Sequence, residues 1–135
     1  MTPTPIYLSY SGRNCEAVLQ VMEAIVWGGY GLVCDCSLPN SEIFESRTER
    51  MINKVAADGI FVAVVTHDAT DCSYMDWELR CALEAKARML LVVADRAALP
   101  PRLQDVPAVW ELCHVSALPT DTEMAAVKQC LQKMM

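Results

Sequence analysis

The sequence predicts an α/β fold of the flavodoxin-like type: a three-layer sandwich whose central five-stranded parallel sheet, in the order 2-1-3-4-5, has helices on both faces. Three observations lead to this prediction. Short apolar runs alternate with helical patterns along the chain, which is typical of a parallel sheet with helical crossovers. Two runs, 60–66 and 89–95, are apolar on both faces, as in strands covered on both sides. The length of 135 residues suggests one domain, residues 1–135.

The first part of the chain predicts two strands, each followed by a helix. IYLSY at 6–10 predicts the first strand, and 13–27 follows with apolar residues at helical spacing. Two glycines, 28–29, end that helix, as glycine does at a helix C-terminus. GLVCD at 31–35 predicts the second strand, and a helix is expected from about 43–57. The side chains expected to face the core from these helices are Cys15, Val18, Leu19, Met22, Ile25, Val26, Phe44, Met51, Ile52 and Val55.

The second part of the chain predicts three more strands. IFVAVVT at 60–66 and MLLVVAD at 89–95 are the third and fourth strands, with a helix over roughly 74–87 between them. The segment 96–108 is punctuated by prolines and predicts a loop with a turn of helix. AVWELCHV at 108–115 predicts a short fifth strand.

The last helix has a clear start signal in the sequence. Thr120 and Glu123 form a capping-box pattern, in which each side chain bonds the backbone N–H of the other residue. We therefore expect a helix from near Thr120. The side chains expected to face the core are Met124, Val127, Leu131 and Met134.

Composition and charge argue against several classes of function. The net charge is −6, from 11 basic and 17 acidic residues, and no Lys/Arg cluster occurs. We therefore expect no nucleic-acid partner, because binding a duplex requires concentrated positive charge. No apolar run approaches the roughly 18 residues of a membrane helix, and no secretory signal is expected. Seven cysteines without a C-x-x-C pair favour buried thiols in a reducing cytoplasm over disulfides or a metal site.

Polar residues stand where four of the predicted strands end. These ends are Ser9-Tyr10, Asp35, Thr66-His67 and Asp95. In open α/β sheets, ligands bind beyond the carboxyl ends of the strands, at the switch point beside the first strand. We therefore expect a ligand cleft at this edge. A strand end that simply reaches water is also polar, so both interpretations stay open at this point.

Two known functions of such folds each require particular residues at the carboxyl ends of the strands, and these can be compared with the residues present here. A phosphoacceptor receiver requires an aspartate after the third strand and paired acids after the first, but Thr66 and the stretch 9–11 occupy these places. A flavodoxin requires a hydroxyl-rich loop after the first strand, which 9–14 supplies. It also requires aromatic rings from the later loops, which 67–73 and 96–107 lack. The receiver is excluded, and flavin binding stays a minor alternative.

A third interpretation starts from an acid in the helix after the third strand. Glu78 lies in the first turns of that helix, with Tyr74 and Trp77 at helical spacing beside it. A carboxylate beside aromatic rings at a cleft edge is partly desolvated, which raises its pKa and strengthens its attraction for a cation. Acids also favour the first turns of helices because of the helix dipole, so the pattern allows a site without requiring one.

The order and spacing of several segments resemble those of the TIR domain family over most of the chain. The similar segments are the opening strand Ile6–Ser11, a BB-loop-like run Asp35–Phe44, the segment Ala57–Val62, the stretch Ser73–Leu79 and the run Leu99–Trp110. No single motif is specific, so the resemblance depends on their succession. Tyr74 stands where the family usually has tryptophan.

This resemblance implies one of two functions. Some TIR domains cleave NAD⁺ as a substrate, releasing nicotinamide and forming ADP-ribose or cyclic ADP-ribose. Others are non-catalytic adaptors that signal by TIR–TIR interaction through the BB loop. We favour the enzyme, working in the cytoplasm and activated by self-association in immune or cell-death signalling, with the adaptor as the alternative.

The resemblance also implies a set of site residues. In the cleaving group the glutamate that matches Glu78 is catalytic, and neither a cofactor nor a metal is required. We expect NAD⁺ to contact Ser9, Tyr10, Ser11, Gly12, Arg13, Asp35, Leu38, Phe44, Tyr74 and Trp77.

Overall fold

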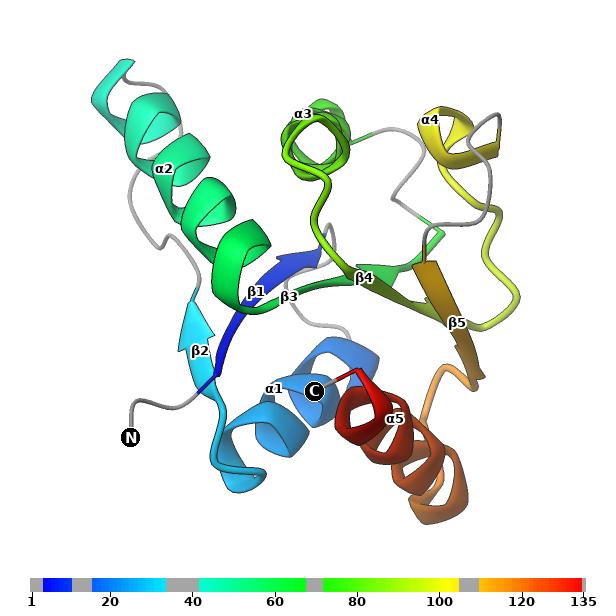
Figure 1. The fold of residues 1–135 in the computed structure, drawn as a ribbon. Coiled ribbons are helices and arrows are strands. Elements are labelled where there is room, and N and C mark those ends of the chain that lie inside the picture. The colour runs from blue at the N-terminus through cyan, green and yellow to red at the C-terminus, as the bar shows by residue number, and fades with distance from the viewer. Residues whose placement is uncertain (1–3, 11–15, 34–41, 68–71, 105–109, 135) are drawn as a thin grey trace.

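A five-stranded sheet in which every strand runs parallel to its neighbours forms the centre of the molecule (Figure 1). The computed structural model describes residues 4–10, 16–33, 42–67, 72–104 and 110–134, with the side chains of 42–47, 104 and 110 left aside. The strands are β1 Pro5–Tyr10, β2 Gly31–Val33, β3 Ile60–Val65, β4 Met89–Ala94 and β5 Trp110–Val115. Their order, β2-β1-β3-β4-β5, confirms the predicted fold class.

In the described parts of the chain, five helices cover the two faces of this sheet. They are α1 Glu16–Trp27, α2 Glu42–Asp58, α3 Ser73–Glu84, α4 Pro101–Gln104 and α5 Asp121–Lys133. Helices α1 and α5 lie on one face, and α2, α3 and α4 lie on the other (Figure 1). No helix in the described parts of the chain is long and apolar enough to cross a membrane.

The strands divide their side chains between two cores because successive residues of a strand point to opposite faces. On β1, Ile6 and Leu8 pack beneath α1 and α5, whereas Tyr7 packs beneath α2 and α3. All the side chains of β3 and β4 are buried, as the apolar runs predicted. Predicted ends at 13–15, 34–35 and 108–109 lie outside the described residues.

The face that α1 turns to the sheet differs from the predicted one. Val18 and Ile25 are buried as expected, but Leu19 and Val26 are 47% and 56% exposed. Their expected places in the core are taken by Ala17, Val21 and Ala24, two of which are small. The physical reason is that the small side chain of alanine lets a helix pack closely on a sheet. Because alanine is only weakly hydrophobic, its position in a sequence gives little indication of burial. Met22 is partly buried, and Cys15 lies outside the described residues.

Two helices end in the same hydrogen-bond pattern, once with glycine and once without it. At the end of α1, Gly29 has φ +82°, and Tyr30 N–H donates to the Ile25 carbonyl at 3.2 Å. At the end of α3, Lys86 has φ +58°, and Ala87 N–H donates to the Ala82 carbonyl at 3.0 Å. Both are Schellman ends. The prediction that the third helix reaches residue 87 is therefore wrong. The left-handed position that ends this helix is usually occupied by glycine, which is a recognisable stop signal, but here it is occupied by a lysine.

Replacing Lys86 with glycine should stabilise the protein by about 0.5–1 kcal/mol, because glycine adopts positive φ without a steric penalty. Lys86 is exposed, so little packing is lost. Urea denaturation of the wild type and the variant measures the difference. Lys86→Ala is the matched control, since it shortens the side chain but keeps the strain. A glycine variant no more stable than the alanine variant would contradict the prediction.

The capping box predicted for the last helix is present at the start of α5. Thr120 N–H donates to a Glu123 carboxylate oxygen at 2.9 Å, and Glu123 N–H donates to the Thr120 hydroxyl at 3.2 Å. The inward stripe is confirmed as well: Met124, Val127 and Leu131 are buried, and Met134 is partly buried against them. Helix α5 is thus fixed by local sequence signals together with one apolar face.

Candidate functional site

The side chain of Glu78 points into the protein, toward the sheet. It is 2% exposed, although it is ionisable and lies on a helix near the molecular surface. The Tyr7 hydroxyl donates a hydrogen bond to one carboxylate oxygen, and the Ser9 hydroxyl donates to the other at 2.9 Å. Both donors come from β1, about 70 positions away in the sequence. The site therefore depends on how α3 sits over the first strand.

The periods of a strand and a helix explain this arrangement. Tyr7 and Ser9 are two residues apart on β1, so both side chains point to the face covered by α3. On α3, Met75, Glu78 and Leu79 are all buried, which is the i, i+3, i+4 pattern of one helix face. Glu78 thus occupies a position where an apolar side chain would be usual, and it meets two hydroxyl groups there.

Two tyrosines interact with the carboxylate, and each of them packs against a further aromatic ring. Tyr74, one helical turn before Glu78, contributes a further side-chain hydrogen bond to it. The rings of Tyr74 and Trp77 lie 5.8 Å apart between centroids, at an angle of 36°. The Tyr7 ring stacks on Phe61 of β3, with centroids 5.4 Å apart and planes within 7°. Glu78 is thus shielded from water at 2% exposure, while hydroxyl groups bind its oxygens.

Burial and hydrogen bonding act on Glu78 in opposite directions, and burial dominates. Loss of hydration disfavours the charged carboxylate, while hydrogen bonds from Tyr7, Ser9 and Tyr74 favour it. The net result raises the pKa of Glu78 from its usual 4.5 to about 7. Burial and the neighbouring Glu78 also raise the pKa of Tyr7, so Tyr7 stays a hydrogen-bond donor.

This arrangement can hold or release a proton near neutral pH, and in its charged form it attracts a cation. A carboxyl group poised at such a pKa is a common feature of catalytic and binding sites. Ser9 is the next-to-last residue of β1, so the carboxylate lies close to the carboxyl edge of the sheet, where ligands bind in folds of this type.

The predicted site residues are only partly brought together. Ser9 and Tyr74 contact Glu78, and Trp77 is partly buried beside Tyr74. Tyr10 packs instead against the core beneath α1 and α5, on the opposite face of the sheet from Glu78, because neighbouring residues of a strand alternate between faces. Ser11, Gly12, Arg13, Asp35, Leu38 and the side chain of Phe44 lie outside the described residues.

The carboxyl ends of β3 and β4 add a second polar pair to this edge. A ring nitrogen of His67 lies 3.3 Å from a carboxylate oxygen of Asp95, and both side chains are largely exposed. Asp95 and the next residue, Arg96, both have positive φ, 51° and 55°. The histidine thus has a partner at the strand ends.

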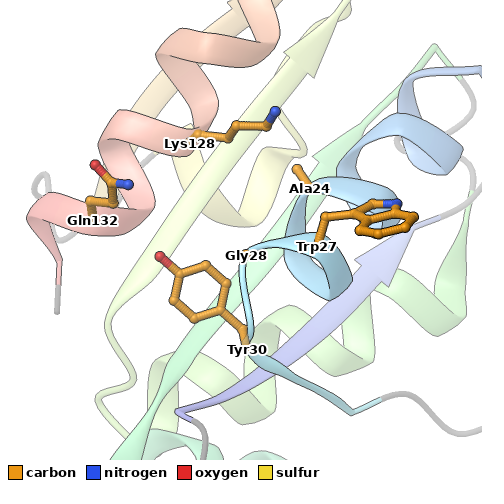
Figure 2. A pocket seen from close by; sticks show the side chains of 6 residues that line it. All are labelled: Ala24, Trp27, Gly28, Tyr30, Lys128 and Gln132. Atoms are coloured by element: carbon orange, nitrogen blue, oxygen red, sulfur yellow. The ribbon is translucent and has the colours of Figure 1, made fainter.

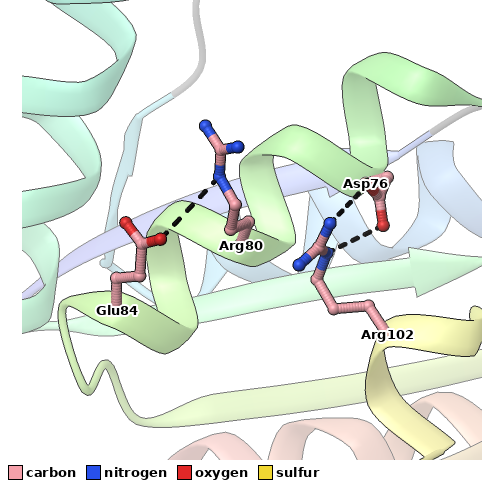
Figure 3. Close-up of polar contacts among 4 residues, drawn as sticks. All are labelled: Asp76, Arg80, Glu84 and Arg102. Atoms are coloured by element: carbon pink, nitrogen blue, oxygen red, sulfur yellow. Dashed lines mark hydrogen bonds and ion pairs between the residues drawn. The ribbon is translucent and has the colours of Figure 1, made fainter.

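Two structural features of the site were not anticipated from the sequence. From the sequence, Tyr7 was identified only as a strand residue, although its hydroxyl binds Glu78. The spacing could have indicated this role, because Tyr7 and Ser9 are two positions apart and so place their hydroxyl groups on the same face of the strand. Arg102 of α4 also binds Asp76 of α3 through two hydrogen bonds, both 2.8 Å long (Figure 3). This bidentate ion pair joins the start of α3 to α4. Farther along α3, Arg80 and Glu84 form a longer ion pair of 3.9 Å.

Two hollows in the described surface lie away from Glu78, on the other face of the sheet. The one in Figure 2 has a volume of about 150 Å³ and lies between α1 and α5. It is lined by Ala24, Trp27, Gly28, Tyr30, Lys128 and Gln132. A second hollow of about 200 Å³ adjoins it and shares Ala24, Trp27 and Lys128. Neither contains a residue predicted for the site.

No cluster of three or more His, Cys, Asp or Glu side chains able to hold a metal ion occurs among the described residues. No protein-family model matches the chain, and no curated protein is significantly similar to it in sequence.

Proposed function

We propose that this chain is a TIR-like NAD⁺ nucleosidase in which Glu78 is the catalytic residue. It would release nicotinamide from NAD⁺ and form ADP-ribose or its cyclic form. One observation supports this proposal above the others: a carboxylate with a pKa near 7 is held by hydroxyl groups next to the carboxyl edge of the sheet. The resemblance of the sequence to TIR domains provides the choice of substrate.

The chemistry requires little more than one well-placed carboxylate. Nicotinamide is bound in NAD⁺ as a pyridinium, so it leaves as a neutral amine and needs no general acid. The transition state then resembles an oxocarbenium ion on the ribose, as in glycoside hydrolysis. A negatively charged Glu78 would stabilise that positive charge and accept hydrogen bonds from the ribose hydroxyls.

The burial of Glu78 has a consequence for activity. At 2% exposure, the carboxylate meets a ribose only after surrounding side chains have moved. We propose that self-association of the chain provides this rearrangement, so that dilute protein is nearly inactive. A cytoplasmic location is part of the proposal, since Cys72, Cys81, Cys113 and Cys130 are free thiols.

Nicotinamide release should therefore rise more steeply than in proportion to protein concentration. The measurement is chromatography of NAD⁺ and nicotinamide over a wide range of protein concentration, with light scattering on the same samples to follow assembly. A molecular crowding agent should shift the rise to lower concentration. If the chain assembles but leaves NAD⁺ intact at every concentration, the enzyme is rejected and the non-catalytic adaptor is the better interpretation.

A further inference from the structure

Cys113 and Cys130 form a pair of thiols on the face of the sheet opposite Glu78. Cys113 lies on β5, the last strand in the sheet order, and Cys130 lies on α5. Their sulfur atoms are 2.9 Å apart. Cys113 is 8% exposed, whereas Cys130 is partly buried against the same core. The two sulfurs are thus in direct contact although 17 positions separate them in the chain.

We propose that Cys113 and Cys130 are a redox pair that a hydroperoxide converts into a disulfide linking α5 to β5. The sulfur atoms of a disulfide are about 2.05 Å apart, so the two thiols need to approach by less than 1 Å. A shift of this size is within the reach of side-chain rotation. Among the cysteines that the structure describes, Cys72 and Cys81 have no such sulfur neighbour in contact.

The exposure of the two thiols sets the order of the chemistry. Cys130 is the more accessible sulfur, so it attacks the peroxide O–O bond and becomes a sulfenic acid, with the alcohol or water as leaving group. Cys113 then attacks the Cys130 sulfur, the S–O bond breaks, and water leaves with the thiol proton. Two electrons pass from the sulfurs to the peroxide. Burial raises the pKa of Cys113, which lowers its thiolate fraction and slows the second step at neutral pH.

The disulfide would join the C-terminal helix to an edge strand and close a loop of 17 positions. Cross-linking such a loop restricts the unfolded chain, and the expected rise in Tm is on the order of 10 °C. This inference does not depend on the proposed NAD⁺ cleavage, because the pair lies on the opposite face of the sheet from Glu78.

The test is to oxidise the folded protein with hydrogen peroxide, alkylate the remaining thiols, and digest the denatured protein with trypsin without reduction. Trypsin cleaves after Lys128, so peptide 103–128, which contains Cys113, should appear linked to peptide 129–133, which contains Cys130. Thermal unfolding of the same sample should show the higher Tm. Dithiothreitol should restore both the separate peptides and the original Tm.

Cys130→Ser should abolish both the linked peptide and the rise in Tm. Cys72→Ser is the matched control. Cys72 caps the start of α3, where its sulfur accepts a hydrogen bond from Met75 N–H at 3.4 Å. Serine can also fill this role, so the Cys113–Cys130 link should still form. The inference is overturned if oxidation of the folded wild type links other cysteines, stops at separate oxidised thiols, or leaves the Tm unchanged. The dithiothreitol comparison within the wild type keeps the test decisive even if a variant folds poorly.

Discussion

Glu78→Gln should lower the rate of nicotinamide release by about 100-fold or more, equivalent to about 3 kcal/mol of transition-state stabilisation. Glutamine has nearly the same shape as glutamate, and its amide oxygen can still accept the Ser9 hydrogen bond. What it lacks is the negative charge that would stabilise the oxocarbenium ion. The measurement is chromatography of nicotinamide at a protein concentration where the wild type is active.

Glu84→Gln is the matched control for this experiment. Glu84 lies on the same helix, is exposed, and pairs loosely with Arg80 at 3.9 Å, so its loss should leave the rate unchanged. Circular dichroism should show that both variants are folded. If folded Glu78→Gln releases nicotinamide at the wild-type rate, Glu78 has no part in the mechanism. An equal loss in both variants would point to general damage to α3.

The stability of the folded protein should decrease by about 3 kcal/mol as pH rises from 4.5 to above 7, through Glu78 alone. Below pH 4.5 this side chain is protonated in both the folded and the unfolded chain. Between pH 4.5 and 7 the unfolded chain loses the proton while the folded protein retains it, so ionisation favours unfolding. Above the folded pKa both forms are ionised, and the contribution becomes constant.

Urea denaturation of the wild type and Glu78→Gln at a series of pH values isolates this contribution, because the other titrating groups are common to both proteins. The free energy of unfolding of the variant, minus that of the wild type, should grow by about 3 kcal/mol between pH 4.5 and about 8. A constant difference would show that the pKa of Glu78 is the same in the folded and the unfolded chain. In Tyr7→Phe, loss of a hydroxyl that lowers the pKa of Glu78 should move the change to higher pH.

The two expectations describe one trade-off. A carboxylate that is desolvated among aromatic rings reduces the stability of the fold at neutral pH, because water no longer hydrates its charge. The same desolvation strengthens its interaction with a developing positive charge. Groups that reduce stability in this way are often functional. A purely structural Glu78 would show the pH-dependent stability and no effect on NAD⁺.

The alternation of apolar runs and helical patterns predicted the strands and the helices between them, because each of these signals is local. Thr120 and Glu123 marked the start of α5 in the same way. The strand order came from the preference for right-handed crossovers, which leaves few topologies, and the structure has that order. The prediction failed where local sequence allowed two outcomes. Leu19 and Val26 belong to an apolar arc of α1 wider than the face that packs. Lys86 follows the end of α3 in the left-handed conformation that glycine usually adopts, so no glycine in the sequence signals this helix end.

The candidate site divides in the same way between sequence and structure. The sequence by itself determined that an acid, Glu78, follows the third strand with Tyr74 one helical turn before it. Only the tertiary structure decided that this acid turns inward onto Tyr7 and Ser9, and that Tyr10 turns to the opposite face. The pKa near 7 belongs to the structure as well. The physical reason is that desolvation and hydrogen bonding at Glu78 arise from residues that only the packing of α3 on β1 brings into contact.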